Sequence, residues 1–245
     1  MGVECAGVTL PVRDVARSAR FYTALLGLPA PGGPVLHIGA AIIQLWQSDD
    51  PAVPQASNDP MFRHMALVVQ DILAAQELAL AAAARATSSM PQRLPAWNPA
   101  ASGIAAWYFR DPDGHPLELI QFPPGKGNPA WREPSDRLVL GIDHMALVVE
   151  DTVASLEFYH GLGFCVSGYS VNVGPEQEAL SGVPGAAVLI TSLAGSSSLG
   201  LELLQYLRPG TLPASGAGCR AATLIPGYAG PGRDPSGHLI QDGPC

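Results

Sequence analysis

The sequence predicts an α+β protein built from repeated strand–helix–strand units, and three observations support this. A Val-x-Asp motif closes a short apolar run at three places, Val12-Arg13-Asp14, Val69-Gln70-Asp71 and Val149-Glu150-Asp151. A run typical of a helix follows each motif. Matching Asp-Pro-x-Gly-His turns lie within 110–115 and 233–238. Because such units must pair to bury their apolar faces, we expect paired sheets with a ligand cleft between them.

Unit one occupies residues 1–50. Alternating apolar residues predict a strand at 7–12. Asp14 is placed to cap a helix, whose apolar positions recur at helical spacing up to Gly27. Two short strands are expected after a Gly-Gly-Pro turn, the second of which ends at Trp46. Unit one is therefore a strand, a helix and two or three short strands.

Unit two occupies residues 60–124, after a loop rich in Asp, Pro, Ser and Asn. A strand at 62–69 and a helix starting at Asp71 repeat the beginning of unit one. A hairpin over 104–122 ends the unit. Its turn at 110–115 contains Pro, which fixes φ, and Gly, which tolerates positive φ.

A segment rich in Pro, Gly and charged residues at 125–137 predicts a linker between two halves of the chain. The first half, 1–124, contains units one and two. The second half, 138–245, contains unit three at 138–209 and a short unit four at 210–245. The expected organisation is thus four units in two halves.

Unit three repeats the pattern with a strand at 142–149 and a helix at 152–161. Its polar segment at 172–178 is expected to form a solvated loop. Unit four has no room for a helix, so we expect only strands, around 219–225 and 237–241. Its short sheet would leave part of unit three uncovered, and such an apolar face favours a homodimer.

Composition restricts the classes of partner. The formal net charge is −8 and Lys126 is the single lysine, which argues against nucleic acid because phosphate neutralisation needs clustered basic residues. The longest apolar run, 78–84, is too short to span a bilayer, and the first ten residues do not resemble a signal peptide. We therefore expect a small-molecule ligand, without nucleic acid or membrane.

The cysteines indicate a reducing compartment. Cys5, Cys165, Cys219 and Cys245 are widely separated and form no Cys-x-x-Cys pair. Reduced thiols are favoured over disulfides or a cysteine-bound metal in such a chain, and the expected location is the cytoplasm.

Four segments resemble the vicinal oxygen chelate superfamily, which includes glyoxalase I, bleomycin-resistance proteins and extradiol dioxygenases. These segments are Arg63–Val69, Ile142–Val149, Ser155-x-x-Phe158-Tyr159 and Arg110–Leu119. The resemblance covers most of the chain and is weakest after Pro209. It implies four βαβββ modules that form paired curved sheets with their helices on the outside. It is specific for the fold and not for the reaction, because one fold supports many chemistries.

The resemblance also implies a set of metal ligands. Metal-dependent members carry a His or Gln on the first strand of a module and a Glu on its last strand. The first-strand positions here are Gly7, His64, His144 and Ala221, and the last-strand positions are Gln44, Glu118, Glu202 and Gln241. Units two and three thus have both ligands, and the implied metal ligands are His64, Glu118, His144 and Glu202. Imidazole and carboxylate together suit Zn, Fe, Mn, Ni or Co.

Two arrangements of the units remain open. Pairing of adjacent units, one with two and three with four, is the commoner arrangement and resembles the extradiol dioxygenases. Each cleft would then contain one His and one Glu, and both could be structural remnants. Pairing of two with three and one with four, as in fused double-length glyoxalases, would bring all four ligands into one site and leave the other cleft empty.

Two functions follow from these arrangements. The resemblance implies a metal-dependent lyase or isomerase in which the metal binds vicinal oxygens and stabilises an enolate-type intermediate. The catalytic carboxylate would be Glu118 or Glu202. Ring-cleaving dioxygenase chemistry is disfavoured, because a cleft between units three and four lacks a second His and a second Glu. The alternative is a binding protein for an antibiotic or metabolite, without metal or catalysis.

A few further side chains are candidates for other roles. His115 and His238 follow the turn glycines and are expected at hairpin tips, whereas His37 and His160 fit no ligand pattern. Aromatic residues on strands can line an apolar cleft, although they belong more often to the core. The candidates for a substrate pocket are Trp46, Trp107, Tyr108 and Asn172.

Overall fold

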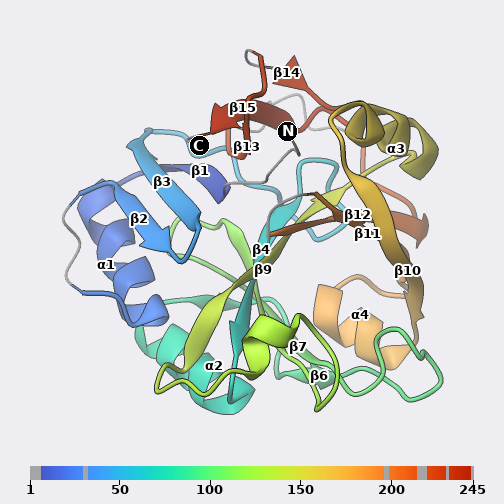
Figure 1. The fold of residues 1–245 in the computed structure, drawn as a ribbon, viewed down its shortest axis with the longest axis horizontal. Helices are drawn as coiled ribbons and strands as arrows, with labels where there is room; N and C mark the ends of the chain where they lie inside the picture. Colours follow the sequence, from blue (N-terminus) through green and yellow to red (C-terminus); the bar gives the residue numbers. More distant parts are fainter. Residues whose placement is uncertain (1–6, 30–32, 196–198, 214–219, 230–231, 244–245) are drawn as a thin grey trace.

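A computed structural model of the chain describes residues 7–29, 33–195, 199–213, 220–229 and 232–243. Its described strands form two sheets, and β4 and β9 lie side by side near the centre of the molecule (Figure 1). The helices α1, α2 and α3 lie towards the periphery (Figure 1). The prediction of an α+β fold is confirmed.

The smaller sheet combines the first and last parts of the chain. It has six strands in the order β14-β15-β13-β1-β3-β2. Their bounds are β1 Gly7–Val12, β2 Val35–Ile38, β3 Ala41–Gln47, β13 Ala222–Pro226, β14 Gly232–Arg233 and β15 Leu239–Gly243. Unit one is therefore paired with unit four, through the antiparallel contact between β1 and β13.

The larger sheet combines units two and three. Its order is β10-β11-β12-β9-β4-β8-β7-β5, and β6 pairs with β7 beside this path. Its bounds are β4 Arg63–Val69, β5 Arg85–Ala86, β6 Gln92–Arg93, β7 Ala105–Arg110, β8 Pro116–Gln121, β9 Val139–Val148, β10 Cys165–Val173, β11 Ala187–Ala194 and β12 Gly200–Arg208. Antiparallel pairing of β4 with β9 joins the two units. The structure thus has the two–three and one–four arrangement.

Three equivalent helices follow the first strands of units one, two and three, as predicted. They are α1 Val15–Leu26, α2 Ile72–Ala81 and α3 Thr152–Gly161. Asp14, Asp71 and Asp151 are extended residues whose carboxylates accept hydrogen bonds from the first-turn N–H groups. Side-chain capping of this kind satisfies donors that have no partner within the helix. The Val-x-Asp motif therefore marks the point where each strand ends and each helix begins.

One helix was missed in the sequence. The segment 172–178 was expected to be a loop, but α4 spans Pro175–Ser181. Proline suits the first helical position because the N–H group that it lacks would have no partner there. Glu176 and Glu178 lie in the first turn, where their charge is favourable. These start signals lie within seven residues, too few for a helical periodicity to be recognised.

The described residues of unit four form strands, as expected, although their bounds differ by a few residues from the prediction. Cys219, which began the first predicted strand, lies outside the described residues, as do Cys5 and Cys245. Cys165 is free and exposed. Unit four extends the sheet of unit one and does not cover unit three. The homodimer therefore stays a prediction, and the incomplete cover of unit three no longer supports it. No described helix is both long and apolar enough to cross a membrane.

The repeated turns hold the two units of each half together. Asp111 is fully buried, and its carboxylate accepts hydrogen bonds from Tyr22 Oη at 2.9 Å and from three backbone N–H groups of its own turn. His115 Nε2 lies 2.5 Å from the carbonyl oxygen of Pro11 on β1. The turn of unit two is therefore attached to both the helix and the first strand of unit one.

Unit four contacts unit three in the same way. Asp234 accepts a hydrogen bond from Tyr159 Oη at 3.0 Å, and His238 Nε2 lies 2.6 Å from the carbonyl oxygen of Val148. Both histidines are buried, His115 at 4% and His238 at 1% exposure. Both histidines lie in hairpin loops, as predicted, and each ring enters the neighbouring unit.

Replacing Tyr22 or Tyr159 with Phe is expected to destabilise the protein. Each change removes a hydrogen bond to a buried carboxylate, and such bonds contribute about 1.5–3 kcal/mol. The free energy of unfolding, measured by urea titration, should fall by this amount in both variants. Tyr169→Phe is the control, because Tyr169 is 76% exposed. Equal stability of all three variants and the wild type would contradict the assigned role of the turns.

Candidate metal centre

The candidate centre lies where four strands of the larger sheet meet in register. On β4 and β9, His64 pairs with Ala146 and His144 pairs with Ala66. Ala66 in turn pairs with Glu118 on β8, and Ala146 pairs with Glu202 on β12. Because residues that pair in a sheet share a face, all four candidate ligands project from the same side. Each pair of ligands in a row is separated by one alanine.

The distances show how closely these side chains approach. Glu118 Oε2 lies 3.0 Å from His64 Nε2 and 3.5 Å from His144 Nε2. Ligand atoms of these three residues all lie within 4.8 Å of one another. His144 Nε2 also lies 3.4 Å from Glu202 Oε2. The three-residue group could therefore hold a metal ion, and Glu202 lies beside it.

The Nε2 atoms of the two histidines are free to bind a metal ion as far as their hydrogen bonds are concerned. The Nε2 atoms of both histidines are buried and make no hydrogen bond of good geometry, although Glu118 lies close to each. Buried polar groups in proteins are usually hydrogen-bonded. Two imidazole nitrogens within reach of one carboxylate are a donor set that binds a divalent ion. The residues present thus fit a metal ion.

The surroundings position the two imidazoles differently. The ring of His64 packs between aromatic rings, with centroid distances of 4.8 Å to Tyr108 and 5.6 Å to Phe62. His144 Nδ1 instead lies 3.1 Å from Asp143 Oδ2. A carboxylate on the second ring nitrogen fixes the tautomer and the orientation of a metal-binding histidine. A carboxylate therefore orients the His144 ring, whereas packing against aromatic rings orients the His64 ring.

A β-bulge explains how Asp143 reaches its neighbour. The register between β4 and β9 shifts between Ala66 and Leu67, whose partners are His144 and Ile142. Asp143 is the extra residue, and bulges of this kind redirect a side chain. Its Oδ1 accepts a hydrogen bond from the indole N–H of Trp131 at 2.7 Å. Trp131 belongs to the short 3₁₀ helix η1, Pro129–Arg132, so the predicted linker contributes to the site.

Asp143 was not identified from the sequence. Strict alternation along a strand places it on the face opposite to His144. The one signal in the sequence was an acidic residue directly before the candidate ligand His144. Only a bulge brings the two side chains together, and the bulge is not visible in the sequence.

Burial and charge act against each other at the centre. Burial alone would raise the pKa of Glu118, but the adjacent imidazoles of His144 and His64 lower it to about 2. Burial alone would lower the pKa of His144, but Glu202, Asp143 and Glu118 together raise it well above its ordinary value. Without a metal, the centre therefore holds a carboxylate and a protonated imidazole. A bound cation would take the place of that proton.

A cavity of about 750 Å³ opens in front of these residues. Such a volume is typical of small-molecule sites. Glu118, His144 and Glu202 lie on its wall, and so do Tyr108 and Asn172 from the predicted substrate pocket. Asn172 accepts a hydrogen bond from the side-chain amide of Asn98 at 2.7 Å.

The other two aromatic candidates do not line this cavity. Trp107 is fully buried on the opposite face of its strand, where it stacks on Phe109 and donates a hydrogen bond to the carbonyl oxygen of Ser88. Trp46 lies on β3 of the smaller sheet and is 38% exposed. Trp107 faces away from the cavity because successive residues of β7 face opposite sides and its neighbour Tyr108 faces the cavity.

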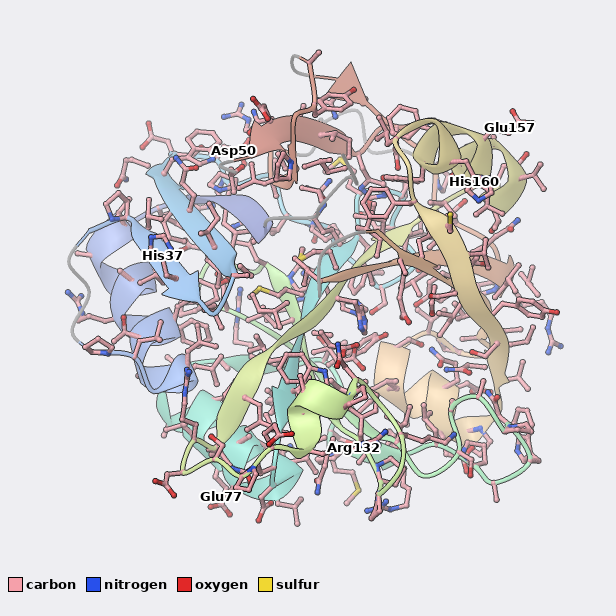
Figure 2. The ribbon with its side chains drawn as sticks, viewed as in Figure 1. His37, Asp50, Glu77, Arg132, Glu157 and His160 are labelled. Atoms are coloured by element: carbon pink, nitrogen blue, oxygen red, sulfur yellow. The ribbon has the colours of Figure 1, made fainter. Side chains whose placement is uncertain are left out.

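The remaining histidines lie on the surface. Figure 2 places His37 on β2 and His160 on α3, at the periphery of the molecule. Both are exposed. Neither belongs to the group of described residues that could hold a metal.

The smaller sheet offers no comparable set of ligands. Its registers make Gly7 and Gln44 equivalent to His64 and Glu118. They also make Ala222 equivalent to His144, which corrects the sequence alignment to Ala221 by one residue. A Cβ atom on Gly7 would lie 2.0 Å from the carbonyl oxygen of Ile42, so no side chain fits there. This face therefore lacks a first-strand ligand for steric reasons.

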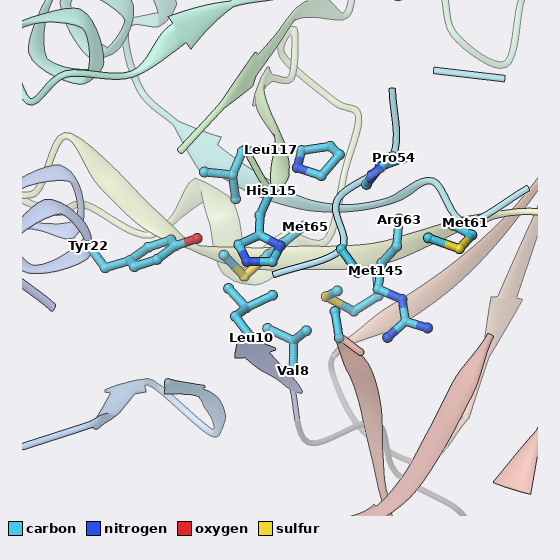
Figure 3. Close-up of a pocket in the computed structure, with 13 residues that line it drawn as sticks. Val8, Leu10, Tyr22, Pro54, Met61, Arg63, Met65, His115, Leu117 and Met145 are labelled. Atoms are coloured by element: carbon cyan, nitrogen blue, oxygen red, sulfur yellow. The ribbon is translucent and has the colours of Figure 1, made fainter. Parts of the chain in front are cut away.

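A second cavity lies between the two sheets (Figure 3). Its volume is about 20 Å³, which is room for about one water molecule. Its walls include Leu10, Met65 and Met145, together with Tyr22 of α1 and His115 of the turn at 110–115. It is too small for an organic ligand and belongs to the packing between the sheets.

Comparison with known proteins supports the fold. Residues 6–119 match the sequence model of the Glyoxalase/Bleomycin resistance protein/Dioxygenase superfamily. The structure of glyoxalase I from Zea mays superimposes with a TM-score of 0.63 at 16% identity, covering 97% of this chain and 91% of that chain. A putative dioxygenase from Bacillus subtilis gives 0.56 at 16% identity, covering 96% and 83%. No curated protein matches the sequence. The fold is the vicinal oxygen chelate fold.

The two pKa shifts define a pH window for the metal-free protein. The contribution of His144 is present below the ordinary pKa of about 6.5 and is lost as the pH rises through its raised pKa. The contribution of Glu118 is present above about 4.5 and is lost as the pH falls towards 2. The ion cluster should therefore stabilise the fold most between about pH 4.5 and 6.5.

Glu118→Gln tests this window. In the presence of a chelator at pH 6, the variant should lose about 3 kcal/mol of unfolding free energy, because a buried imidazolium loses its partner. The difference between variant and wild type should shrink as the pH falls from 4.5 towards 2. Urea titrations across this range measure it. A difference that is independent of pH would contradict the assigned ionisation of Glu118.

Proposed function

We propose that this protein belongs to the glyoxalase/bleomycin resistance protein/dioxygenase superfamily and is a metal-dependent lyase or isomerase that acts on a small molecule with vicinal oxygens. One divalent ion would be held by His64, His144 and Glu118, with Glu202 beside it. The observation that carries this proposal is the convergence of two buried imidazoles on one buried carboxylate. Two imidazole ligands and one carboxylate ligand suit Zn, Fe, Mn, Ni or Co.

The bound ion would supply Lewis acidity towards the oxygens of a substrate in the cavity. The two glutamates would divide the remaining work. Glu118 lies between both histidines, so it is the ligand. Glu202 contacts only His144, and its other oxygen accepts a hydrogen bond from Ser192 at 2.8 Å. Because Glu202 is less enclosed and faces the cavity, it would move the proton between carbon atoms of the substrate.

A ring-cleaving dioxygenase is the second candidate. A cleft between units three and four would lack the second histidine that this reaction needs, but the sheets pair unit two with unit three. Two histidines and one carboxylate form the facial set that is used by non-haem iron oxygenases. Glu202 favours the lyase or isomerase, because it supplies a second carboxylate beside the ion that can act as the base of a proton transfer. Oxygen consumption by the iron-loaded protein with a catechol would instead support the dioxygenase.

Metal content is the first test. Protein freed of metal by chelation should take up about one Zn²⁺ or Co²⁺ per chain, as measured by elemental analysis and calorimetry. His64→Ala and Glu118→Gln should each weaken metal binding by at least about 100-fold, since each removes a ligand. Glu157→Gln, an exposed change on α3, is the control (Figure 2). Failure of the wild type to bind either ion at micromolar concentration would favour the metal-free binding protein.

Proton transfer is the second test. The metal-loaded protein should catalyse exchange of the C–H protons of hydroxyacetone in D₂O, as followed by NMR. Glu202→Gln should retain metal and lose at least about 100-fold of this exchange, the range typical of general-base catalysis. Unchanged exchange in Glu202→Gln would exclude it as the base. Absence of exchange in the metal-loaded wild type would leave binding as the better account.

A further inference from the structure

We propose that the cavity selects ligands whose group beyond the vicinal oxygens is positively charged or neutral, and that it rejects carboxylates and phosphates. A compound with vicinal oxygens and a cationic amine is the class that fits best. This inference rests on the proposed function, because it assumes that the vicinal oxygens face the metal centre. It goes further by naming the charge of the substrate.

The charged side chains on the wall of the metal-loaded cavity all have one sign, because a histidine that binds a metal ion is neutral. Glu118, Asp143 and Glu202 line it. The chain has 13 Lys and Arg residues, and every one of them lies within the described residues. None of these 13 side chains is part of the wall. An anionic group that enters the cavity therefore finds no positive side chain, and desolvating an unpaired charge is costly.

The nearby cations are engaged with the backbone. Lys126 donates to the carbonyl oxygens of Pro99 and Ala100, and Arg132 donates to those of Gly125 and Gly127. Arg93 donates to the carbonyl oxygen of Gly103. These hydrogen bonds tie the basic side chains to backbone carbonyl oxygens, so the side chains stabilise loops and do not face a ligand in the cavity.

A bound divalent ion would not reverse this balance. Its two positive charges would be matched by Glu118 and Glu202, and Asp143 would remain. Asp143 accepts a hydrogen bond from the indole N–H of Trp131 and lies 3.1 Å from His144 Nδ1, so its carboxylate is held at the cavity wall. The remaining field at the cavity is therefore negative, and it attracts cations and repels anions.

The neutral part of the wall also suits a cation or an uncharged arm. Tyr108 lies on the wall beside the metal centre and presents an aromatic ring to the cavity. Ile120, Phe122 and Ile190 provide apolar surface, and Ser170 and Asn172 provide neutral hydrogen-bonding groups. None of these groups carries a positive charge that would balance a phosphate or a carboxylate.

Three catechols that differ in charge test the inference. Dopamine is cationic, 4-methylcatechol is neutral and 3,4-dihydroxyphenylacetate is anionic, while all three offer the same pair of oxygens. Calorimetry on Zn²⁺-loaded protein under argon should give the tightest binding for dopamine. The anion should bind at least about tenfold more weakly than dopamine, as expected for a charge change a few ångströms from a buried carboxylate. Equal or tighter binding of the anion would overturn the inference.

A matched pair of variants separates the cavity from the overall charge of the protein. Ser170→Lys adds a positive charge on the wall, whereas Val171→Lys adds it to the next residue of β10, which is exposed and not on the wall. Ser170→Lys should reduce the preference for dopamine over the anion at least threefold, and Val171→Lys should not. Equal effects of both variants would overturn the inference.

The two proposals fail in different ways. Absence of Zn²⁺ uptake would overturn the proposed function before any catechol is added. Full Zn²⁺ uptake without binding of any of the three catechols, or with preference for the anion, would overturn the charge selection and leave the metal site intact.

Discussion

The candidate centre depends on one contact, the antiparallel pairing of β4 with β9. Each half of the chain supplies one histidine and one glutamate, which are too few to hold a divalent ion well. The pairing sets His64 opposite Ala146 and His144 opposite Ala66, so that both rings project from one face with a methyl group between each pair of ligands. A shift of this register by one residue would turn His64 or His144 to the opposite face.

Two kinds of contact connect the four units of the fold. The sheets join units from different halves, whereas the buried Asp-Pro-x-Gly-His turns attach the units within each half. Each unit is therefore held by non-covalent contacts both to a unit of its own half and to a unit of the other half. Such contacts suit a site whose ligands come from both halves. The described residues of the smaller sheet follow the same plan without a matching group of ligands, and close approach of β3 to Gly7 leaves no room for a ligating side chain at that position.

Local features were readable from the sequence because they depend on local physics. The three strands, their capping aspartates and the ligand positions follow from alternation and from helix-start chemistry. Pairing of the units could not be chosen, because both arrangements satisfy the same alternation. Asp143 was missed because a bulge breaks that alternation, and Trp107 was offered as a cleft residue although its neighbour Tyr108 faces the cavity. Each departure arises from contacts between segments that are distant in sequence.

The central claim is that one ion binds between the two halves, and anomalous X-ray diffraction from a crystal of the Co²⁺- or Zn²⁺-loaded protein tests it most directly. The account predicts one anomalous peak per chain, about 2.0–2.2 Å from a ring nitrogen of His64, a ring nitrogen of His144 and a carboxylate oxygen of Glu118. A peak elsewhere, or ligands from only one half of the chain, would contradict it.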